Sequence, residues 1–438
     1  MLSRSCSRCL LAIAILASLA VGAPAQQPPG AKGVIREDRV IAGSRKDSIE
    51  VRRLVLAGSN EEIGRTLARI ARERYQVKAE ASQDRLITAA QRRYIEKNFP
   101  ILHERMRGVA AEFDKRWGDD AWNHSMLGFM ELRAGCSVFY LPAQFTELGT
   151  GIVSRDYDFT TGGLFGPLPP GRLHPTARPY LVELHPDRGY ASVAMVAYDL
   201  LSGVLDGMNS EGLTVALLAD DELLNKFKME PTGGPAVGLG VLQMLRLLLD
   251  TCGTVGEAKE ALLQTKQYYE VVPVHYLIAD RFGSAFIWEF SHAHNKEYII
   301  ENPDRPLITT NFSLHRYLSK NRPPSAEQAK KVCRRYCTLT EQLGAHSGKM
   351  SVDFIKATHK QVDAVRAQNV AGKATERTFW HALYYPEQRR VQISYYLRDE
   401  PVADQAGKVQ IVRSDYIEFP LAKTEKAKGN PAVGATAP

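Results

Sequence analysis

One cysteine, Cys136, stands directly behind a glycine in the stretch MELRAGCSVFYLPA, residues 130–143. A free cysteine usually packs as a small buried hydrophobe, so its surroundings must supply any case for chemistry. A cut between Gly135 and Cys136 would give one residue both a thiol and a free α-amine. The ordinary pKa of that amine, about 7.7 to 8.0, leaves a neutral fraction that can accept the thiol proton. Gly135 suits such a cut because a residue without Cβ tolerates a strained backbone.

The motifs around Cys136 resemble those of N-terminal-nucleophile hydrolases of the penicillin acyltransferase and choloylglycine hydrolase type. The segment RAGCSVF is similar to the family's processing site, and VSRDYDF is similar to its first hairpin. Arg155 and Asp158 follow the cysteine by 19 and 22 residues, in the family's Arg-x-x-Asp arrangement. The resemblance implies that Asp158 holds the α-amine and that Arg155 lines the site near the thiol. Taken alone, the pair also fits a salt bridge at a strand end.

Two asparagines follow in the order that the family uses. DGMNSEGLTVAL is similar to its Gly-Met-Asn segment, and LITTNF is similar to its Thr-Asn segment. The resemblance implies that Asn209 belongs to the oxyanion hole and that the Asn311 amide donates to the oxyanion. Taken singly, each asparagine fits a turn, since Asn tolerates left-handed backbone and bonds its own main chain. The family's late arginine corresponds to Arg335 or to Arg377, and the spacing does not choose between them.

The resemblance extends upstream of the cysteine. GSNEEIGRTLARIARERY is similar to the helix opening of the acyltransferase subgroup's small chain, so the likeness covers roughly residues 53 to 400. The related bile-salt hydrolases begin almost at their cysteine, whereas about a hundred residues of the expected mature chain precede it here. This organisation favours the self-processing acyltransferase branch. We expect a small chain at 26–135 and a catalytic chain at 136–422 that stay associated after cleavage.

The predicted secondary structure that must position these residues changes at Cys136, from mainly helices before it to mainly strands after it. Upstream, the polar residues 26–50 predict a flexible lead-in. Ser59 and Glu62 then have capping-box spacing, and apolar residues follow at helical intervals. Downstream, apolar runs between turn residues predict strands and hairpins, interrupted by paired helices. Such blocks indicate an α+β fold, a four-layer αββα sandwich of two antiparallel sheets with a helical N-terminal segment.

The two ends of the chain carry different signals. Two arginines precede an apolar run, and Ala-Pro-Ala at 23–25 forms a small-residue cleavage pattern. These features predict a secretory signal peptide at 1–25 and a periplasmic or secreted protein. No later apolar run reaches the roughly 18 residues of a membrane helix, so we expect no stable membrane insertion. The Lys-, Ala-, Gly- and Pro-rich tail at 423–438 is predicted to be disordered.

Charge and cysteine content exclude several classes of protein. The formal charge of +7 is spread among interleaved acids, which predicts no nucleic-acid partner. Cys252, Cys333 and Cys337 are too few for a disulfide scaffold, and the last two favour reduced or core-facing thiols over a metal or redox pair. His292 and His294 have a spacing that can ligate a metal, but no further ligands accompany them. We therefore predict neither a metal site nor a cofactor.

These observations predict an exported, self-processing cysteine hydrolase or acyltransferase that acts on the linear amide bond of a small molecule through a Cys136 thioester. Penicillins, N-acyl amino acids, acyl-homoserine lactones, bile-salt-like conjugates and small peptides all remain open as substrates. One alternative is an inactive binding protein of the same fold, in which Cys136 is merely buried. Another is a histidine-assisted thiol protease, which needs no new amino terminus.

Overall fold

The computed structural model describes most of the chain after Gly33. The described residues are 34–123, 135–160, 177–197, 199–201, 203–220, 236–268, 273–291, 294–317, 323–330, 333–365, 376–403 and 409–422. The predicted signal peptide and the predicted disordered tail lie outside these ranges. No helix in the described part is both long enough and apolar enough to cross a membrane.

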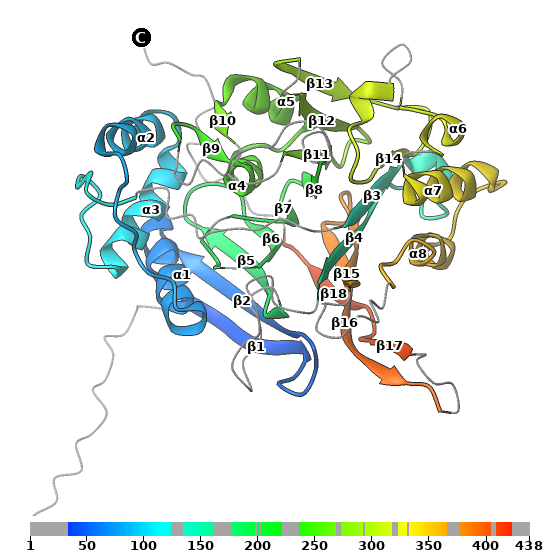
Figure 1. Cartoon of the computed structure of the whole chain (residues 1–438), viewed down its shortest axis with the longest axis horizontal. Coiled ribbons are helices and arrows are strands. Elements are labelled where there is room, and N and C mark those ends of the chain that lie inside the picture. Colours follow the sequence, from blue (N-terminus) through cyan, green and yellow to red (C-terminus); the bar gives the residue numbers. More distant parts are fainter. Residues whose placement is uncertain are drawn as a thin grey trace, which may run out of the picture. The chain divides into compact units, whose positions relative to one another are not determined.

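The first sheet has nine strands and is antiparallel except where β2 runs parallel to β5 (Figure 1). In their hydrogen-bonded order the strands are β1 (Ile35–Gly43), β2 (Glu50–Gly58), β5 (Tyr180–Pro186), β6 (Ser192–Val196), β7 (Asp206–Asn209), β8 (Thr214–Ala219), β11 (Val274–Ala279), β12 (Ala285–Ser291) and β13 (Lys296–Ile300). The middle strands β6, β7, β8 and β11 are buried along their whole length. Burial on both faces is what a sheet inside a layered fold requires.

The second sheet has seven strands, all in antiparallel pairs. They are β14 (Leu307–Thr309), β3 (Cys136–Leu141), β4 (Ile152–Thr160), β15 (Glu376–Tyr385), β16 (Arg390–Pro401) and β17 (Val409–Arg413), with β18 (Ile417–Pro420) also paired to β16. Cys136 is the first residue of β3 and lies opposite Tyr157 on β4. The fold therefore places the thiol at a strand end, directly beside the strand that carries Arg155 and Asp158.

Helices and short elements complete the described structure. The helices are α1 (Asn60–Tyr75), α2 (Arg85–Asn98), α3 (Pro100–Glu112), α4 (Val241–Thr251), α5 (Val255–Gln264), α6 (Ala326–Ala329), α7 (Arg334–Ala345) and α8 (Val352–Lys360). The short strands β9 (Leu239–Gly240) and β10 (Gln267–Tyr268) pair with each other, and 3-10 turns lie at Ala143–Phe145 and Leu314–Tyr317. The capping box predicted at Ser59 and Glu62 is formed at the start of α1.

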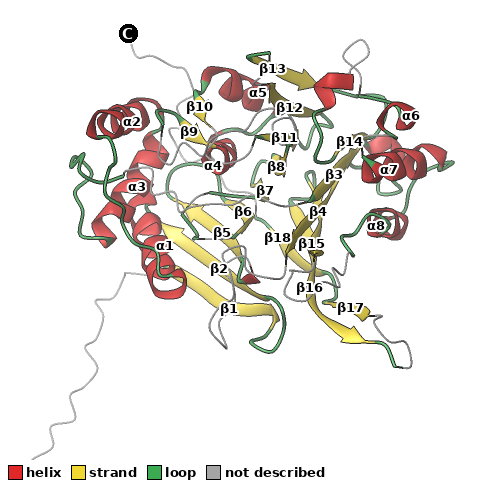
Figure 2. Ribbon diagram, in the orientation of Figure 1, coloured by secondary structure: helices red, strands yellow, loops and turns green. Residues whose placement is uncertain are grey.

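The two sheets pack face to face with helices outside them (Figure 2). Across the interface, the Trp380 indole and the Tyr384 hydroxyl donate hydrogen bonds of 3.1 Å and 2.5 Å to the carboxylate of Asp206. Helices α1, α4 and α5 contact the first sheet, and α7 and α8 contact the second. This arrangement confirms the predicted α+β fold and its four αββα layers.

The N-terminal segment differs from the prediction in one respect. The predicted helical segment is present as α1, α2 and α3, but strands β1 and β2 precede it, and β1 lies within the region predicted to be a flexible lead-in. β1 is an edge strand with mostly exposed, charged side chains, IREDRVIAG. Charged edge strands protect a sheet from pairing with other chains, but they lack the apolar alternation by which a strand is recognised.

Helices α1 and α3 cross at two glycines. A Cβ atom at Gly64 would lie 1.9 Å from the carbonyl oxygen of Arg105, and one at Gly108 would lie 1.9 Å from that of Glu61. Each contact is far shorter than any real Cβ contact and is made to backbone, which cannot move aside cheaply. Glycine at both positions is therefore required for this close packing of the two helices.

We predict that Gly64→Ala lowers the free energy of unfolding by about 1 to 3 kcal/mol, because the added methyl group overpacks the α1–α3 contact. Urea unfolding measures the change. Gly344→Ala is the matched control, since a Cβ at that position in α7 meets no atom within 4 Å. The control should be neutral or stabilising by up to about 1 kcal/mol, because alanine is the better helix former. Equal effects of the two substitutions would contradict the packing account.

Candidate active site

Both sides of the Gly135–Cys136 peptide bond are held by hydrogen bonds. The carbonyl oxygen of Gly135 accepts from the backbone N–H of Asp158 at 2.8 Å. The N–H of Cys136 donates to the Asn311 side-chain oxygen at 2.5 Å. A Cβ at Gly135 would lie 3.2 Å from a carboxylate oxygen of Asp158, so glycine allows this acid a close approach to the peptide bond. The predicted cleavage site is thus the point where three predicted site residues meet.

Asp158 is a buried carboxylate with a partner on each oxygen. Its Oδ2 accepts from Arg335 Nη1 at 2.8 Å, and its Oδ1 accepts from the Thr378 hydroxyl at 2.6 Å. Burial raises the pKa of Asp158 to about 6, although the Arg335 charge and the Thr378 hydrogen bond act in the opposite direction. The side chain therefore lies beside Gly135 as an acid whose protonation changes in a mildly acidic range.

Arg335 links the two residues that hold the peptide bond. It donates through Nη1 to Asp158 and through Nη2 to the Asn311 side-chain oxygen at 2.6 Å. Arg377, the other candidate from the sequence, instead forms a two-pronged ion pair with Asp399, at 3.0 Å and 2.6 Å. The geometry thus settles the choice that spacing left open: Arg335 lies at the site, and Arg377 ties β15 to β16.

Arg155 lies near the Cys136 thiol, between the two sheets. It is completely buried, donates a 2.8 Å hydrogen bond to the Leu217 carbonyl and lies 3.7 Å from the Asp206 carboxylate. Burial raises the pKa of the Cys136 thiol, and the positive charge of Arg155 opposes that rise. Arg155 therefore supplies the charge that stabilises a thiolate in this dry position.

Asn311 reaches Cys136 in an orientation that the sequence did not predict. Its side-chain oxygen accepts from the Cys136 N–H and from Arg335, while its amide nitrogen donates to the Ala219 carbonyl at 2.7 Å. The second hydrogen of that nitrogen has no acceptor among the described residues. The residue is in place beside the thiol, and in this structure it holds the backbone of Cys136.

Asn209 is not brought to Cys136, so its assignment to the oxyanion hole is corrected. Its amide nitrogen donates both hydrogens, to the carbonyls of Leu249 and Cys252 at the end of α4. Its side-chain oxygen accepts from the backbone N–H groups of Glu211 and Leu213, in the turn between β7 and β8. An amide with both hydrogens engaged has none left for an oxyanion. Asn209 is the turn residue that its chemistry alone suggested.

A buried charged network, which the sequence analysis missed, surrounds the segment that carries Asn311. His275 Nδ1 lies 3.4 Å from an Asp220 oxygen and 3.3 Å from a Glu289 oxygen. Burial lowers the pKa of His275, but the attraction of the two nearby acids outweighs burial and raises it to about 10. Asp220 also accepts from the Ser313 hydroxyl at 2.6 Å, two residues beyond Asn311.

Glu289 completes this network by capping the turn that follows Asn311. Its oxygens accept from the backbone N–H groups of Leu314 and His315, both at 2.9 Å, and from the His315 ring. Burial raises the pKa of Glu289, but the adjacent His275 and the hydrogen bond from the His315 ring hold it below its usual range. The sequence did contain a signal, because His275 and Glu289 interrupt two otherwise apolar strands, and buried polar groups require partners.

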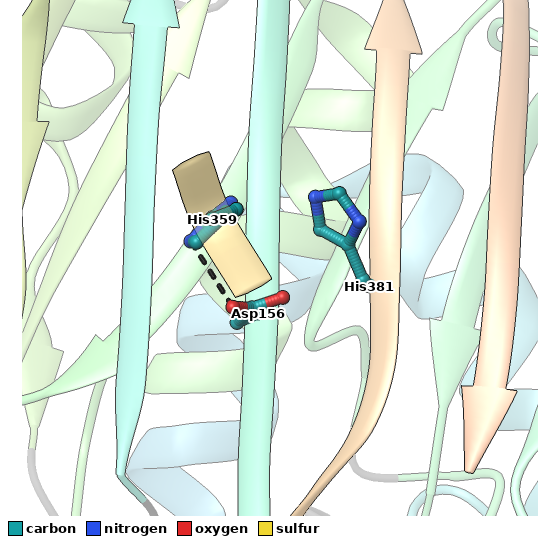
Figure 3. A group of neighbouring side chains, drawn as sticks. All are labelled: Asp156, His359 and His381. Atoms are coloured by element: carbon teal, nitrogen blue, oxygen red, sulfur yellow. Dashed lines mark ion pairs between the residues drawn. The ribbon is translucent and has the colours of Figure 1, made fainter. Parts of the chain in front are cut away.

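A second histidine cluster lies behind β3, on the side of the sheet that faces α8. Asp156, His359 and His381 place three potential metal-ligand atoms within 4.8 Å of one another (Figure 3). The four ring nitrogens already hydrogen-bond hydroxyl groups, those of Ser137, Ser154 and Tyr416. Burial lowers the pKa of His359 and lowers that of His381 to about 3, so both rings are neutral. The cluster is a hydrogen-bonded support for the residue after Cys136.

One of the two histidines singled out in the sequence lies in the described part of the chain. His294 donates or accepts a 2.9 Å hydrogen bond with the Tyr298 hydroxyl. His292 lies outside the described residues. Cys136, Cys252, Cys333 and Cys337 are free thiols in the described structure.

Comparison with known proteins places this geometry in a family. A family model, acyl-coenzyme A:6-aminopenicillanic acid acyl-transferase, matches residues 174–397. A search of curated proteins finds no match.

Three solved structures are similar to the chain. Penicillin V acylase from Agrobacterium tumefaciens is 14% identical over 64% of this chain and 86% of its own, with a TM-score of 0.40. A conjugated bile acid hydrolase from Clostridium perfringens is 15% identical over 66% and 98%, also at 0.40. The N-acylethanolamine-hydrolyzing acid amidase ortholog from Caenorhabditis elegans is 17% identical over 57% and 93%, at 0.33.

The matched region contains Asn311 and Arg335 and begins after the strands that carry Cys136, Arg155 and Asp158. It spans just over half of the 438 residues. The chain therefore belongs to the acyl-coenzyme A:6-aminopenicillanic acid acyl-transferase family.

Proposed function

We propose that this protein is a self-processing cysteine amidase or acyltransferase, activated by cleavage between Gly135 and Cys136. The proposal rests on two hydrogen bonds that hold this one peptide bond. The Asp158 N–H donates to its carbonyl oxygen, and its own N–H donates to the Asn311 side-chain oxygen. A peptide bond held on both sides has a fixed carbonyl for attack, and fixed geometry is a large part of catalysis.

In the proposed cleavage, the sulfur of Cys136 attacks the carbonyl carbon of Gly135 and the C–N bond breaks, which leaves a thioester and a free amine. Water then adds to the thioester, releasing the Gly135 carboxylate and regenerating the thiol. The Asp158 N–H donates to the oxygen that becomes negative in the tetrahedral intermediate, a contact that typically contributes a few kcal/mol. Arg155 stabilises the thiolate that attacks.

After cleavage, the new α-amine of Cys136 lies beside the Asn311 oxygen and the Asp158 carboxylate. Both groups accept hydrogen bonds, so they orient the amine toward its own thiol, from which it takes a proton. The thiolate attacks the carbonyl carbon of a linear amide, the amine leaves with a proton, and an acyl thioester remains. Water or an acceptor amine then releases the acyl group, and the family's name supports the second route.

The charged groups near the Cys136 thiol do not favour a histidine-assisted thiol protease. The charged groups with the largest influence on the Cys136 pKa are Arg155, Asp158 and Arg335. His359 and His381 lie behind the sheet, where they bond Ser137 and Ser154. The α-amine is therefore the base that this site provides.

Two further parts of the proposal concern the mature protein. We propose that residues 1–25 direct export to the periplasm or outside the cell and are then removed. We also propose that the small and catalytic chains stay joined after cleavage. The seven-residue parallel pairing of β2 with β5, on opposite sides of the cut, supports this association.

Mass spectrometry under denaturing conditions tests the cleavage. At the mean residue mass of this chain, mature wild-type protein should give fragments of about 12 kDa and 34 kDa, the larger beginning at Cys136. Cys136→Ala should give one intact species and no turnover of amides, because it removes the attacking sulfur. Cys252→Ala, a buried thiol at the end of α4, is the control and should process normally. Processing of Cys136→Ala would refute the mechanism.

Separate substitution of the two candidate arginines by glutamine tests the assignment of Arg335 to the site. Arg335→Gln should slow processing and amide turnover by about 10- to 1,000-fold, because Asp158 and Asn311 lose their shared charged donor. Arg377→Gln should lower the melting temperature and leave turnover per folded molecule near that of the wild type. Rates measured at a temperature where both variants are folded separate the effects. A larger catalytic loss in Arg377→Gln would reverse the assignment.

The network behind Asn311 predicts a pH-dependent stability. The pKa of His275 is raised to about 10 in the folded protein, from 6.5. Its stabilising contribution is therefore complete below about pH 6.5 and is lost as the pH rises toward 10. Glu289→Gln removes one of its acids, so this loss should end at a lower pH and processing should slow. Melting temperatures between pH 6 and 10 show the shift. Identical pH profiles for variant and wild type would exclude a charged His275.

A further inference from the structure

A hollow of about 630 Å³, including the solvent at its mouth, lies between α3, α4 and the first sheet. Most of its lining is apolar, such as Leu102 and Val109 from α3 and Val182 and Leu184 from β5. Such walls favour the apolar part of a ligand, because its burial removes hydrocarbon surface from water.

The hollow is on the opposite side of the first sheet from Cys136. Successive residues of a strand point to opposite faces. On β6, Val196 lines the hollow, whereas its neighbour Met195 accepts a hydrogen bond from Tyr395 of the second sheet. Cys136 and Arg155 lie on the side where the two sheets meet. A ligand in the hollow would therefore be separated from the thiol by the whole sheet.

The charged residues that line the hollow are both cations, Arg105 and Arg246. They share one carboxylate, Asp250, with a contact of 2.8 Å to each of its oxygens. Arg105 also donates to Asn60, and Arg246 to Ser192, and both acceptors are neutral. The three charged side chains are buried and carry one positive charge in excess.

The two guanidinium groups also have unused donors. The Nε–H of Arg105 and that of Arg246 are buried and have no hydrogen-bond partner among the described residues. Burial lowers the pKa of Arg246, and the nearby Arg105 adds to this effect against the attraction of Asp250. An unpaired buried donor and an uncompensated buried charge are both costly. A negative group in the hollow would relieve both.

We propose that this hollow binds a carboxylic acid with an apolar chain, its carboxylate against Arg105 and Arg246 and its chain along α3 and β5. A monoanion matches the single excess positive charge, whereas a dianion would reverse its sign. The planar carboxylate also suits the fork of N–H donors that a guanidinium presents. The proposal does not depend on the chemistry at Cys136.

Calorimetric titration of the purified full protein with octanoate tests the proposal, with octan-1-ol as the uncharged probe of equal chain length. Octanoate should bind at least about tenfold more tightly than the alcohol, and Arg246→Gln should remove this preference. Arg107→Gln is the matched control, since Arg107 is an exposed arginine of α3 paired with Glu61. Cys136→Ala should bind octanoate like the wild type, which separates this site from the proposed active site.

A second approach does not rely on the fold of the Arg246 variant. Leu201→Trp, at a half-buried position in the lining, should block octanoate by filling the hollow. A photoreactive alkyl carboxylic acid, mapped by mass spectrometry on wild-type protein, should label peptides from α3 or β5. The proposal is wrong if octanoate releases no heat on binding, if Leu201→Trp binds it unchanged, or if labelling occurs only on peptides around Cys136.

Discussion

The buried carboxylate of Asp158 is the constraint on which the site depends. A charged acid cannot remain in a dry interior without partners, and Asp158 finds them in Arg335 and Thr378. The same arginine orients Asn311, so one cation fixes the groups on both sides of the Gly135–Cys136 bond. Arg335 is the second residue of α7, and the position of that helix outside the second sheet thereby becomes part of the chemistry.

The two histidine clusters show that the neighbouring groups determine whether a buried histidine is charged. His275 lies between two acids and is held as a cation, whereas His359 and His381 face hydroxyl groups and are neutral. The charged cluster includes the acids that hold the turn after Asn311, and the neutral cluster holds Ser137 behind the thiol. Each supports one edge of the same site, and burial is equally deep in both.

Local pattern was enough to predict the layered fold, and the family resemblance named several residues that the structure brings together around Cys136. Cys136, Arg155 and Asp158 lie on two adjacent strands, so their short spacing in the sequence is enough to predict that they lie close together. Arg335 comes from a distant helix, and no sequence interval encodes where that helix packs. The prediction for Asn209 was wrong because a turn and an oxyanion hole use the same side-chain chemistry, and only the partners distinguish them. β1 was missed because an edge strand needs charge rather than apolar alternation.

The parallel contact of β2 with β5 has a thermodynamic consequence for a chain cut before Cys136. In the precursor, these strands belong to one molecule, so unfolding and refolding are unimolecular and independent of concentration. In a cut protein they belong to two molecules, and refolding becomes an association whose yield depends on concentration. Cleavage would thus turn a reversible fold into one that is retained chiefly by its slow unfolding.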